Sequence, residues 1–399
     1  GGPAGIYKNT VYPESQHGAT GLAIDAGAAL SNMDQWQYGI ASTKFRWNLS
    51  GTYQQVLPRY ISVDPEGKER EFLYDALGPA SLSLIFLKGY QWPFDTRKVD
   101  GSSQIDLLVA GEIKKGNRVY LDFSQNPKGL EEGFGLLSEE AHAYLEKSNA
   151  LFGTPIRRLA KMNRGAIELY AAHGIDLYKE YLEIAVCAQH CNGGVAVDEN
   201  WQSSVKGLYA AGEAAGTFGV YRPGGSALNS TQVGSLRAAE HIAKSKETAL
   251  QTPEFTMPAI RKGESNIGKI REAFQTEMSS AADFDRDTRR MEALFAKVDA
   301  LCGAFFETAV IGTEAQTAEL FKLYDIIWAI CDEFTWALPA HLHEDTDAEK
   351  IITRIDLFAS ETAFALSEIY HILGDALPKR LKSRIEYEIK RRIVAPYIR

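Results

Sequence analysis

A glycine-rich segment that begins at Gly207 holds the residues best suited to chemistry; it reads GLYAAGEAAGTFGVYRPGGSALNSTQVGSLRAAEHIA. The four apolar residues 208–211 predict a strand in a buried parallel position, and Gly212 permits a sharp turn after it. Glu213 would then emerge at the carboxyl edge of a sheet, where its carboxylate can accept hydrogen bonds from ribose or ribityl hydroxyls. A helix from Ser226 would direct free N–H groups at negative charge on an electron-accepting ring. The alternative is an ordinary strand-to-helix turn whose glycines serve only chain geometry.

The elements that must position these residues are spread along the chain. The pattern predicts a turn with a helix of small residues at 18–30, a mixed α+β region at 33–121 and a helical region at 138–185. A strand–turn–strand at 193–213 and a helical remainder at 261–399 follow. Within them, residues 117–124 predict a strand and Ser138 predicts a helix N-cap. A chain of 399 residues is long enough for roughly two or three domains.

Composition and charge narrow the class of partner. The net charge of −9 and the pI near 5.5 argue against nucleic acid or an anionic membrane as the main partner. No apolar run approaches the roughly 18 residues of a membrane span and no secretory signal is evident, so we expect a cytoplasmic protein. Cys187 and Cys191 form a C-x3-C pair without a second pair of metal-ligand type, which favours free thiols over a disulfide framework or a metal site.

Two stretches of the chain resemble a known family. GGVAVDENWQSSVKGLYAAGEAAG followed by RPGGSALNSTQVGSLRAAEHIA resembles the C-terminal flavin-binding segment of the succinate dehydrogenase/fumarate reductase flavoprotein family, which includes L-aspartate oxidase. GGPAGIY and GATGLAIDAGAALSNMDQWQYG resemble the passage of that family from its nucleotide fold into its capping domain, and the resemblance spans residues 1–327. It implies FAD as cofactor and hydride transfer between the flavin and a small carboxylate-bearing substrate.

The resemblance also implies a fold of class α/β with α+β: a partial flavin-binding Rossmann-like domain with an inserted capping domain, followed by an all-α C-terminal region. The expected flavin-binding domain is formed by residues 1–38 and 188–250, and the capping domain by residues 39–187. A helical domain at 255–327 and a C-terminal helical segment at 328–399 are expected after them. The chain starts without Met, and no Gly-x-Gly-x-x-Gly follows a strand in it. We therefore expect the Gly-x-Gly-x-x-Gly half of the FAD-binding site to lie upstream of Gly1. This chain alone is then expected to bind FAD weakly or not at all, and its activity is not assured.

Site residues follow from the same resemblance. Glu213 would bind the ribityl chain of FAD, and the backbone at the following helix start would lie beside the isoalloxazine. The implied cofactor-binding set is Gly193, Gly194, Gly212, Glu213, Ser226, Ala227 and Leu228. Arg222 would clamp a substrate carboxylate, a task that suits a planar and permanently charged fork. A surface ion pair is the alternative for this arginine.

The family pattern breaks at several positions. Gly39, in QYGIAST, stands where the dicarboxylate reductases carry the histidine of Q-F-H-P-T. Gln189 stands at a second histidine position; His190 follows one residue later, an offset that turns a strand side chain to the opposite face. Arg97, in FDTRKVDGSSQ, is the candidate for the acid that protonates the substrate opposite the flavin. The predicted catalytic set is Arg97, His190 and Arg222, and the departures favour a substrate other than fumarate or succinate.

The end of the chain departs from this family. Residues 328–399 resemble helices of the α/α-toroid domain of heparinase II/III-like proteins, although three or four helices cannot close a toroid. This leaves a second function open: a helical carbohydrate-binding or polysaccharide-lyase-like protein with a degenerate flavin half. The residues that could line a sugar groove are Trp328, Trp336, His341 and His343. The more ordinary interpretation is that the aromatics belong to the core and that the histidines form a pair in a loop. The histidines without ligand spacing, expected to be solvated or locally paired, are His17, His142, His173 and His241.

Overall fold

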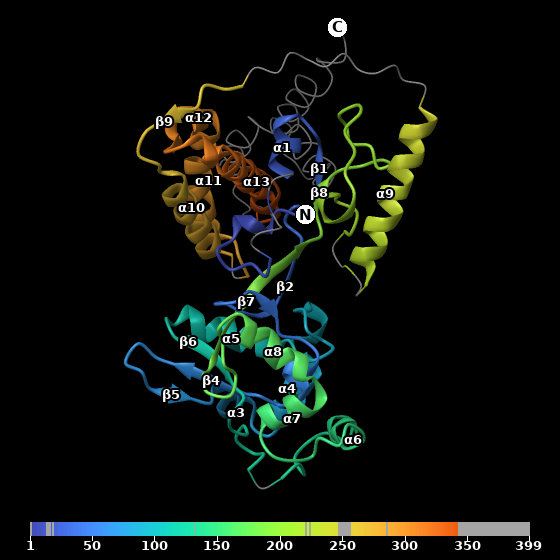
Figure 1. Ribbon diagram of the computed structural model, residues 1–399, viewed down its shortest axis with the longest axis vertical. Helices are drawn as coiled ribbons and strands as arrows, with labels where there is room; N and C mark the ends of the chain where they lie inside the picture. The colour runs from blue at the N-terminus through green and yellow to red at the C-terminus, as the bar shows by residue number, and fades with distance from the viewer. Residues whose placement is uncertain are drawn as a thin grey trace, which may run out of the picture. The chain divides into compact units, whose positions relative to one another are not determined.

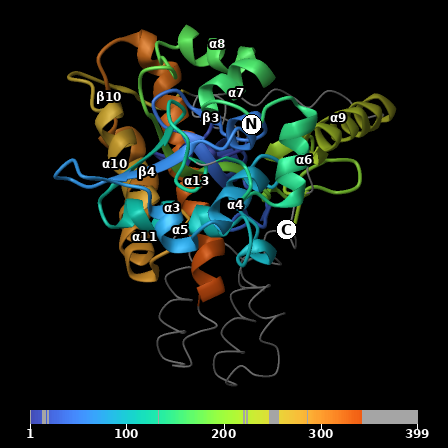
Figure 2. The same cartoon turned by 90° about the horizontal axis from the view of Figure 1, so that it is seen from below.

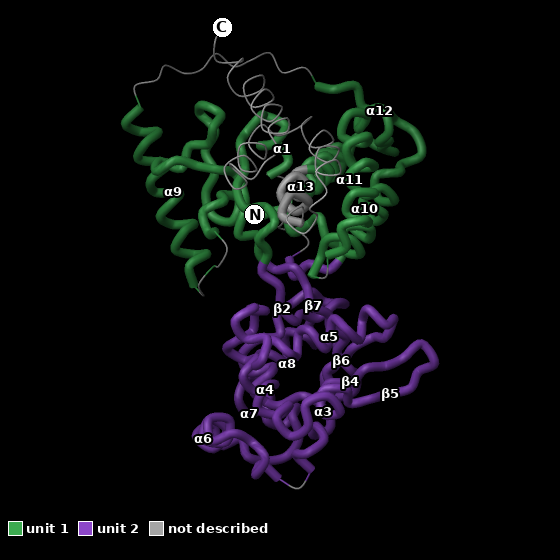
Figure 3. Tube along the Cα trace, turned by 180° about the vertical axis from the view of Figure 1, so that it is seen from behind, with its two compact units in different colours: residues 1–8, 14–36, 190–399 green, residues 9–13, 37–189 purple. Residues whose placement is uncertain are grey.

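The computed structural model describes residues 2–12, 17, 20–131, 133–219, 222, 225–245, 257–284 and 286–341. The chain divides into two compact units (Figure 3): unit 1 is formed from residues 1–8, 14–36 and 190–399, and unit 2 from residues 9–13 and 37–189. Strand β2 (Trp36–Ser42) leads from unit 1 into unit 2, and strand β7 (Leu182–Cys191) leads back (Figure 1). The mixture of helices and sheets confirms the predicted fold class at that level. The predicted role of each domain stays a prediction.

Unit 2 is built on a six-stranded sheet with the order β3-β2-β7-β6-β4-β5. Its remaining strands are β3 (Trp47–Asn48), β4 (Arg59–Val63), β5 (Glu69–Arg70) and β6 (Arg118–Asp122). Strand β6 pairs antiparallel with both β4 and β7, with Val119 opposite Ile184 on the β7 side. The helices of the unit are α2 (Thr52–Gln55), α3 (Phe72–Leu77), α4 (Ala80–Lys88), α5 (Gln104–Lys114), α6 (Glu139–Lys147), α7 (Pro155–Met162) and α8 (Arg164–Ala172), with a 3-10 turn η2 (Thr96–Lys98).

Local sequence signals explain most of the boundaries in unit 2. The predicted N-cap is confirmed, because the Ser138 hydroxyl accepts a hydrogen bond from the Ala141 N–H at 3.4 Å at the start of α6. The predicted strand at 117–124 is confirmed as β6. The predicted helical region 138–185 is wrong over residues 182–185, which belong to β7. The β-branched Ile184 and Val186 lie in a run that is buried on both faces, which suits a central strand better than a helix.

Unit 1 combines short strands with longer helices. Strand β1 (Leu30–Ser31) pairs antiparallel with β8 (Gly194–Val195), and β9 (Arg261–Lys262) pairs parallel with β10 (Val310–Ile311). The helices and 3-10 turns are η1 (Ala4–Ile6), α1 (Thr20–Asp25), η3 (Gly212–Ala214), α9 (Ser226–Lys244), α10 (Ile267–Ala281), α11 (Thr288–Gly303), α12 (Phe305–Thr308), η4 (Glu314–Gln316) and α13 (Thr317–His341). The predicted helical remainder is thus confirmed in outline as far as residue 341, except at strands β9 and β10, where it is wrong. Residues 342–399, which hold most of the toroid-like segment, lie outside the described residues.

The small-residue helix predicted near the N-terminus is confirmed as α1, and it packs against α13 (Figure 1). Helix α13 also packs against α11 (Figures 1 and 2). A Cβ on Gly21 would overlap the backbone carbonyl of Asp325 in α13. The Asp325 carboxylate also accepts the Gly21 N–H at 2.8 Å and so caps the start of α1. No helix within the described residues has the length and apolar character needed to cross a membrane.

Candidate functional site

The segment before Glu213 folds differently from the prediction. Residues 208–211 do not form a buried parallel strand: they are half-buried, and Tyr209 alone makes a bridge, antiparallel, to Gln202. The Asp198 carboxylate accepts the Gln202 N–H at 3.0 Å and closes a tight turn there. Glu213 accordingly lies in the 3-10 turn η3 rather than at the carboxyl edge of a sheet.

Glu213 is held against two other segments of unit 1. Its Oε1 accepts the backbone N–H of Cys191, at the end of β7, at 3.1 Å. On another side, a Cβ on Gly2 would lie 2.5 Å from the same oxygen, so any larger residue at position 2 would displace the Glu213 side chain. Gly212 adopts a φ of +73°, and a Cβ there would lie 2.9 Å from Thr231 Oγ1 of α9. The carboxylate therefore lies where the N-terminal segment, β7 and the turn before α9 converge.

Glycines also bring three backbone segments together beside Glu213. A Cβ on Gly193 would overlap the carbonyl of Asn32, and one on Gly194 would lie 2.5 Å from the carbonyl oxygen of Ala214. A Cβ on Gly216 would overlap the Ser31 hydroxyl, which donates to the Gly216 carbonyl at 3.0 Å. The predicted pair Gly193–Gly194 thus serves close backbone packing that no side chain permits.

The Gly193 contact leads to a first prediction. Gly193→Ala should lower the free energy of unfolding of unit 1 by about 1–3 kcal/mol, because the new methyl group has no room beside Asn32. Denaturant unfolding, followed by hydrogen exchange of peptides from residues 190–216, measures this. Gly268→Ala in α10 is the matched control: a Cβ there meets nothing within 4 Å, and alanine should stabilise the helix by about 0.5–1 kcal/mol. Equal stability of wild type and Gly193→Ala would contradict the packing argument.

His190 and Arg222 are both buried in unit 1, with exposed fractions of 4% and 8%. The His190 ring packs edge-on against Phe218, with 4.8 Å between ring centroids. Burial, with the nearby positive charge of Arg222, lowers the pKa of His190 to about 3, so the ring is neutral at physiological pH. Its Nδ1 lies 3.2 Å from Asn192 Oδ1. Because an amide oxygen only accepts, Nδ1 carries the proton, and the buried Nε2 is an acceptor with no hydrogen-bond partner among the described residues.

Arg97 belongs to unit 2 and is held there by Asp95. The guanidinium donates from Nε to Asp95 Oδ1 at 3.0 Å and from Nη2 to Asp95 Oδ2 at 2.9 Å. The Arg97 hydrogen bonds lower the pKa of Asp95, so the pair stays ionised. In the same unit, a Cβ on Gly39 would lie 2.5 Å from the Trp92 indole. The indole occupies the space where the family pattern places a histidine side chain.

A family model described as FAD binding domain matches residues 2–228 of the chain. The chain belongs to this family. FAD is its cofactor, and the surroundings of Glu213 are compatible with that group: Gly193 packs against the Asn32 backbone, and Gly2 and Gly216 leave room for the side chains of Glu213 and Ser31. The carboxylate of Glu213 is the type of acceptor that sugar-like hydroxyls require.

Known proteins similar to this FAD-binding chain are flavoproteins. One component of the fumarate reductase (CoM/CoB) from Methanothermobacter marburgensis is 30% identical over 344 residues, which cover 82% of this chain and 54% of the relative. An L-aspartate oxidase from Bacillus subtilis is 30% identical over 140 residues, 35% of this chain and 21% of the relative. A solved quinol-fumarate reductase gives a TM-score of 0.51 at 18% identity, over 86% of this chain and 57% of that one. The resemblance to the succinate dehydrogenase/fumarate reductase flavoprotein family is confirmed, and the chain spans about half the length of the relatives it matches most fully.

The first turn of α9 is accessible in this FAD-binding chain. The helix begins at Ser226 after Gly225, which has a φ of +79°. Ser226 and Ala227 are half-buried, and Leu228 is 76% exposed. The start of this 19-residue helix therefore leaves backbone N–H groups near a surface where a cofactor can approach. Their contact with the flavin stays a prediction.

Some residues of the site were missed from the sequence. Gly2 and Ser31 contribute to the surroundings of Glu213 and Gly193 although they lie far from them in sequence, and Gly216, three residues after Glu213, contacts Ser31. The available signal was the small side chains at GGPAG, LSN and AAGT, which permit close backbone approach but do not name the partner. Within the described residues, no group of three His, Cys, Asp or Glu side chains is placed to hold a metal ion.

Two of the remaining histidines have the local partners expected of them. His173 Nδ1 lies 2.8 Å from the Leu169 carbonyl oxygen, and its ring stacks on Phe45. His241 Nδ1 lies 2.7 Å from the Tyr209 hydroxyl. The expectation of locally paired histidines is therefore confirmed at these two positions.

Proposed function

We propose that this chain is the catalytic part of an FAD-dependent oxidoreductase that transfers a hydride between the flavin and a small carboxylate-bearing substrate. The observation that carries the proposal is the placement of Glu213 among converging glycine backbones, within residues matched by an FAD-binding family model. The names of the relatives support the substrate class, because fumarate and aspartate are both small carboxylates.

The proposed roles follow from the chemistry of each side chain. FAD, when bound, supplies the site that accepts or gives up the hydride. Glu213 would hold the ribityl hydroxyls, and Arg222, buried and permanently charged, would bind the substrate carboxylate. His190 is neutral and its Nε2 is an acceptor, so it suits an N–H or O–H group of a ligand but not proton donation. The proposed proton donor is therefore Arg97, as the sequence predicts.

The carbohydrate-binding alternative is not favoured. Of its candidate residues, His343 lies outside the described residues, and the side chains of Trp336 and His341 are not described. The described start of that segment, in α13, contributes Ile330 and Phe334 to the buried core of unit 1. These contacts make the start of the segment part of the packing around α1 and α11.

The proposal predicts a flavin spectrum and a carboxylate-dependent reoxidation. The full chain, incubated with FAD and reduced anaerobically with dithionite, should show flavin bleaching and then regain absorbance on addition of fumarate or crotonate, a dicarboxylate and a monocarboxylate. Arg97→Ala should slow reoxidation by at least about 100-fold, because it removes the general acid, and should leave the spectrum unchanged. Arg118→Ala, whose guanidinium is similarly exposed and ion-paired to Glu183, should react like wild type. If the chain takes up FAD but no small carboxylate reoxidises its reduced flavin faster than buffer alone, the proposal is wrong.

A further inference from the structure

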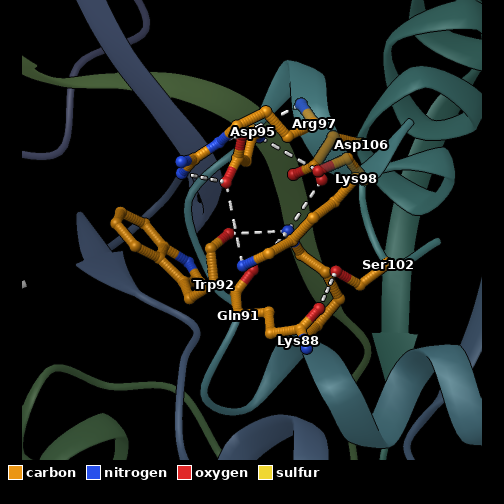
Figure 4. A network of polar contacts seen from close by, with 9 residues as sticks. Lys88, Gln91, Trp92, Asp95, Arg97, Lys98, Ser102 and Asp106 are labelled. Carbon is orange, nitrogen blue, oxygen red and sulfur yellow. Dashed lines mark hydrogen bonds and ion pairs between the residues drawn. The ribbon is translucent and has the colours of Figure 1, made fainter. Parts of the chain in front are cut away.

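Arg97 is ion-paired to Asp95 (Figure 4). The Arg97 side chain is 63% exposed, whereas the Asp95 side chain is almost enclosed, at 9% exposed. Two donors of the guanidinium reach the two Asp95 oxygens in a parallel fork, a geometry that fixes the plane of the group as well as its distance. An exposed arginine otherwise keeps most of its rotamer freedom. The fork removes much of that freedom.

Asp95 is also fixed through its backbone. Its N–H donates to the Ser103 hydroxyl at 3.0 Å, and its carbonyl accepts the Lys98 N–H at 2.9 Å. Asp95 Oδ1 additionally accepts the Arg97 N–H at 3.0 Å, so the side chain caps the turn that carries the arginine. The carboxylate cannot shift without breaking this turn.

A buried ion pair anchors the segment just before Asp95. Lys88 Nζ donates to Asp106 Oδ2 at 2.7 Å, and both side chains are fully buried. The same ammonium donates to the carbonyl oxygens of Trp92 at 2.6 Å and Gln91 at 3.2 Å (Figure 4). One enclosed cation therefore holds two consecutive backbone groups of the segment that leads to Asp95.

We propose that Asp95 is the positioning residue of Arg97: it fixes the guanidinium in the orientation from which Arg97 acts on the substrate. The inference rests on the proposed function, in which Arg97 is the proton donor. The Arg118–Glu183 pair of the same unit is an ordinary bidentate ion pair at the surface. Its Nε–Oε1 and Nη2–Oε2 distances are 2.9 and 2.6 Å, and the exposed fractions of the Arg118 and Glu183 side chains are 65% and 31%. Asp95 differs from Glu183 in being enclosed, in capping the turn of its arginine and in following an anchored segment.

Asp95→Asn tests this inference with little change in shape. Asparagine keeps an oxygen for the Arg97 N–H and is itself a good cap, so the turn should persist while the fork loses its charge and one acceptor. Glu183→Gln makes the same chemical change at the surface fork and is the matched control. The first readout is the rate at which phenylglyoxal modifies Arg97 and Arg118 in the full chain without substrate, followed by peptide mass spectrometry. We expect several-fold faster modification of Arg97 in Asp95→Asn, with Arg118 unchanged.

The second readout is turnover of fumarate or crotonate by the FAD-loaded chain. Asp95→Asn should lower kcat by about 10- to 100-fold and leave KM nearly unchanged, because a misplaced donor affects the transition state more than binding. Glu183→Gln should keep the wild-type kcat. An unchanged modification rate of Arg97, or an unchanged kcat while Arg97→Ala is inactive, overturns this inference alone. Full turnover by Arg97→Ala, or no turnover of any small carboxylate by the FAD-loaded wild type, overturns the proposed function and with it the positioning role of Asp95.

Discussion

Lys88→Met should lower the free energy of unfolding of unit 2 by about 3–5 kcal/mol at neutral pH. The substitution leaves the Asp106 carboxylate enclosed without its cation, and its Oδ1 already lacks a hydrogen-bond partner in the described structure. It also removes the donor from the carbonyl oxygens of Gln91 and Trp92. Calorimetry, with hydrogen exchange of peptides from residues 80–110 to identify the unit that opens, measures the loss.

The pH dependence of this loss distinguishes a charge effect from a packing effect. Burial raises the pKa of Asp106 to about 6 even with Lys88 beside it, and removal of the ammonium can only raise that pKa further. Below pH 6 the carboxyl group of the variant is therefore neutral, and the loss of stability should shrink as the pH falls. A loss that stays constant from pH 5 to pH 8 would show that the methionine merely packs badly.

A double variant separates the pair from its anchoring role. Lys88→Met with Asp106→Leu removes both buried charges, which is often neutral or stabilising, so most of the lost stability should return. A residual loss of about 1–3 kcal/mol should remain for the two carbonyl groups left without a donor. Lys179→Met, which removes an exposed ion pair to Asp176, is the control and should not change unfolding measurably.

The sequence was informative where the chemistry is local. The cap at Ser138, the glycine turn before α9 and the family motif around Glu213 depend on neighbours within a few residues, and the order of residue types along the chain contains them. The family resemblance was confirmed for the same reason, since its motif is long and ordered. The position of each site residue relative to the cofactor stays a prediction.

Contacts between segments that lie far apart in the sequence could not be predicted from it. Nothing in FLKG or QIDL indicates that Lys88 and Asp106 form an enclosed pair, because each alone is typical of a solvated helix surface. Gly39 indicated only a missing side chain, and the indole of Trp92 that fills the space comes from a segment 53 residues later. The error at residues 208–211 has a similar cause: apolar residues predict burial, but the presence of a paired neighbour decides whether they form a strand.

Asp283→Asn should make unit 1 more stable by several kcal/mol at pH 9, with little change near pH 4. The Asp283 carboxyl is enclosed, and burial raises its pKa to about 8. The Phe284 N–H, which donates to it at 2.9 Å, and the charge of Arg286 lower the pKa, but by less than burial raises it. Below pH 4 the group is protonated in both the folded and the unfolded chain. Between pH 4 and about 8 the folded chain keeps the proton and the unfolded chain releases it, so stability falls by up to about 1.4 kcal/mol per pH unit. Asparagine resembles the protonated form and does not titrate.

The difference in unfolding free energy between Asp283→Asn and wild type should therefore grow with pH and level off above pH 8. Asp287, four residues later, provides a control of opposite sign: its hydrogen bond from the Arg290 N–H lowers its pKa, so its contribution is already complete above pH 4. Asp287→Asn keeps a good N-cap and should add no slope between pH 5 and pH 9. Hydrogen exchange of peptides from α10 and α11 reports this region directly. A pH-independent difference for Asp283→Asn would mean that the carboxyl group is ionised in the folded chain, in which case Arg286 compensates its charge more strongly than burial opposes it.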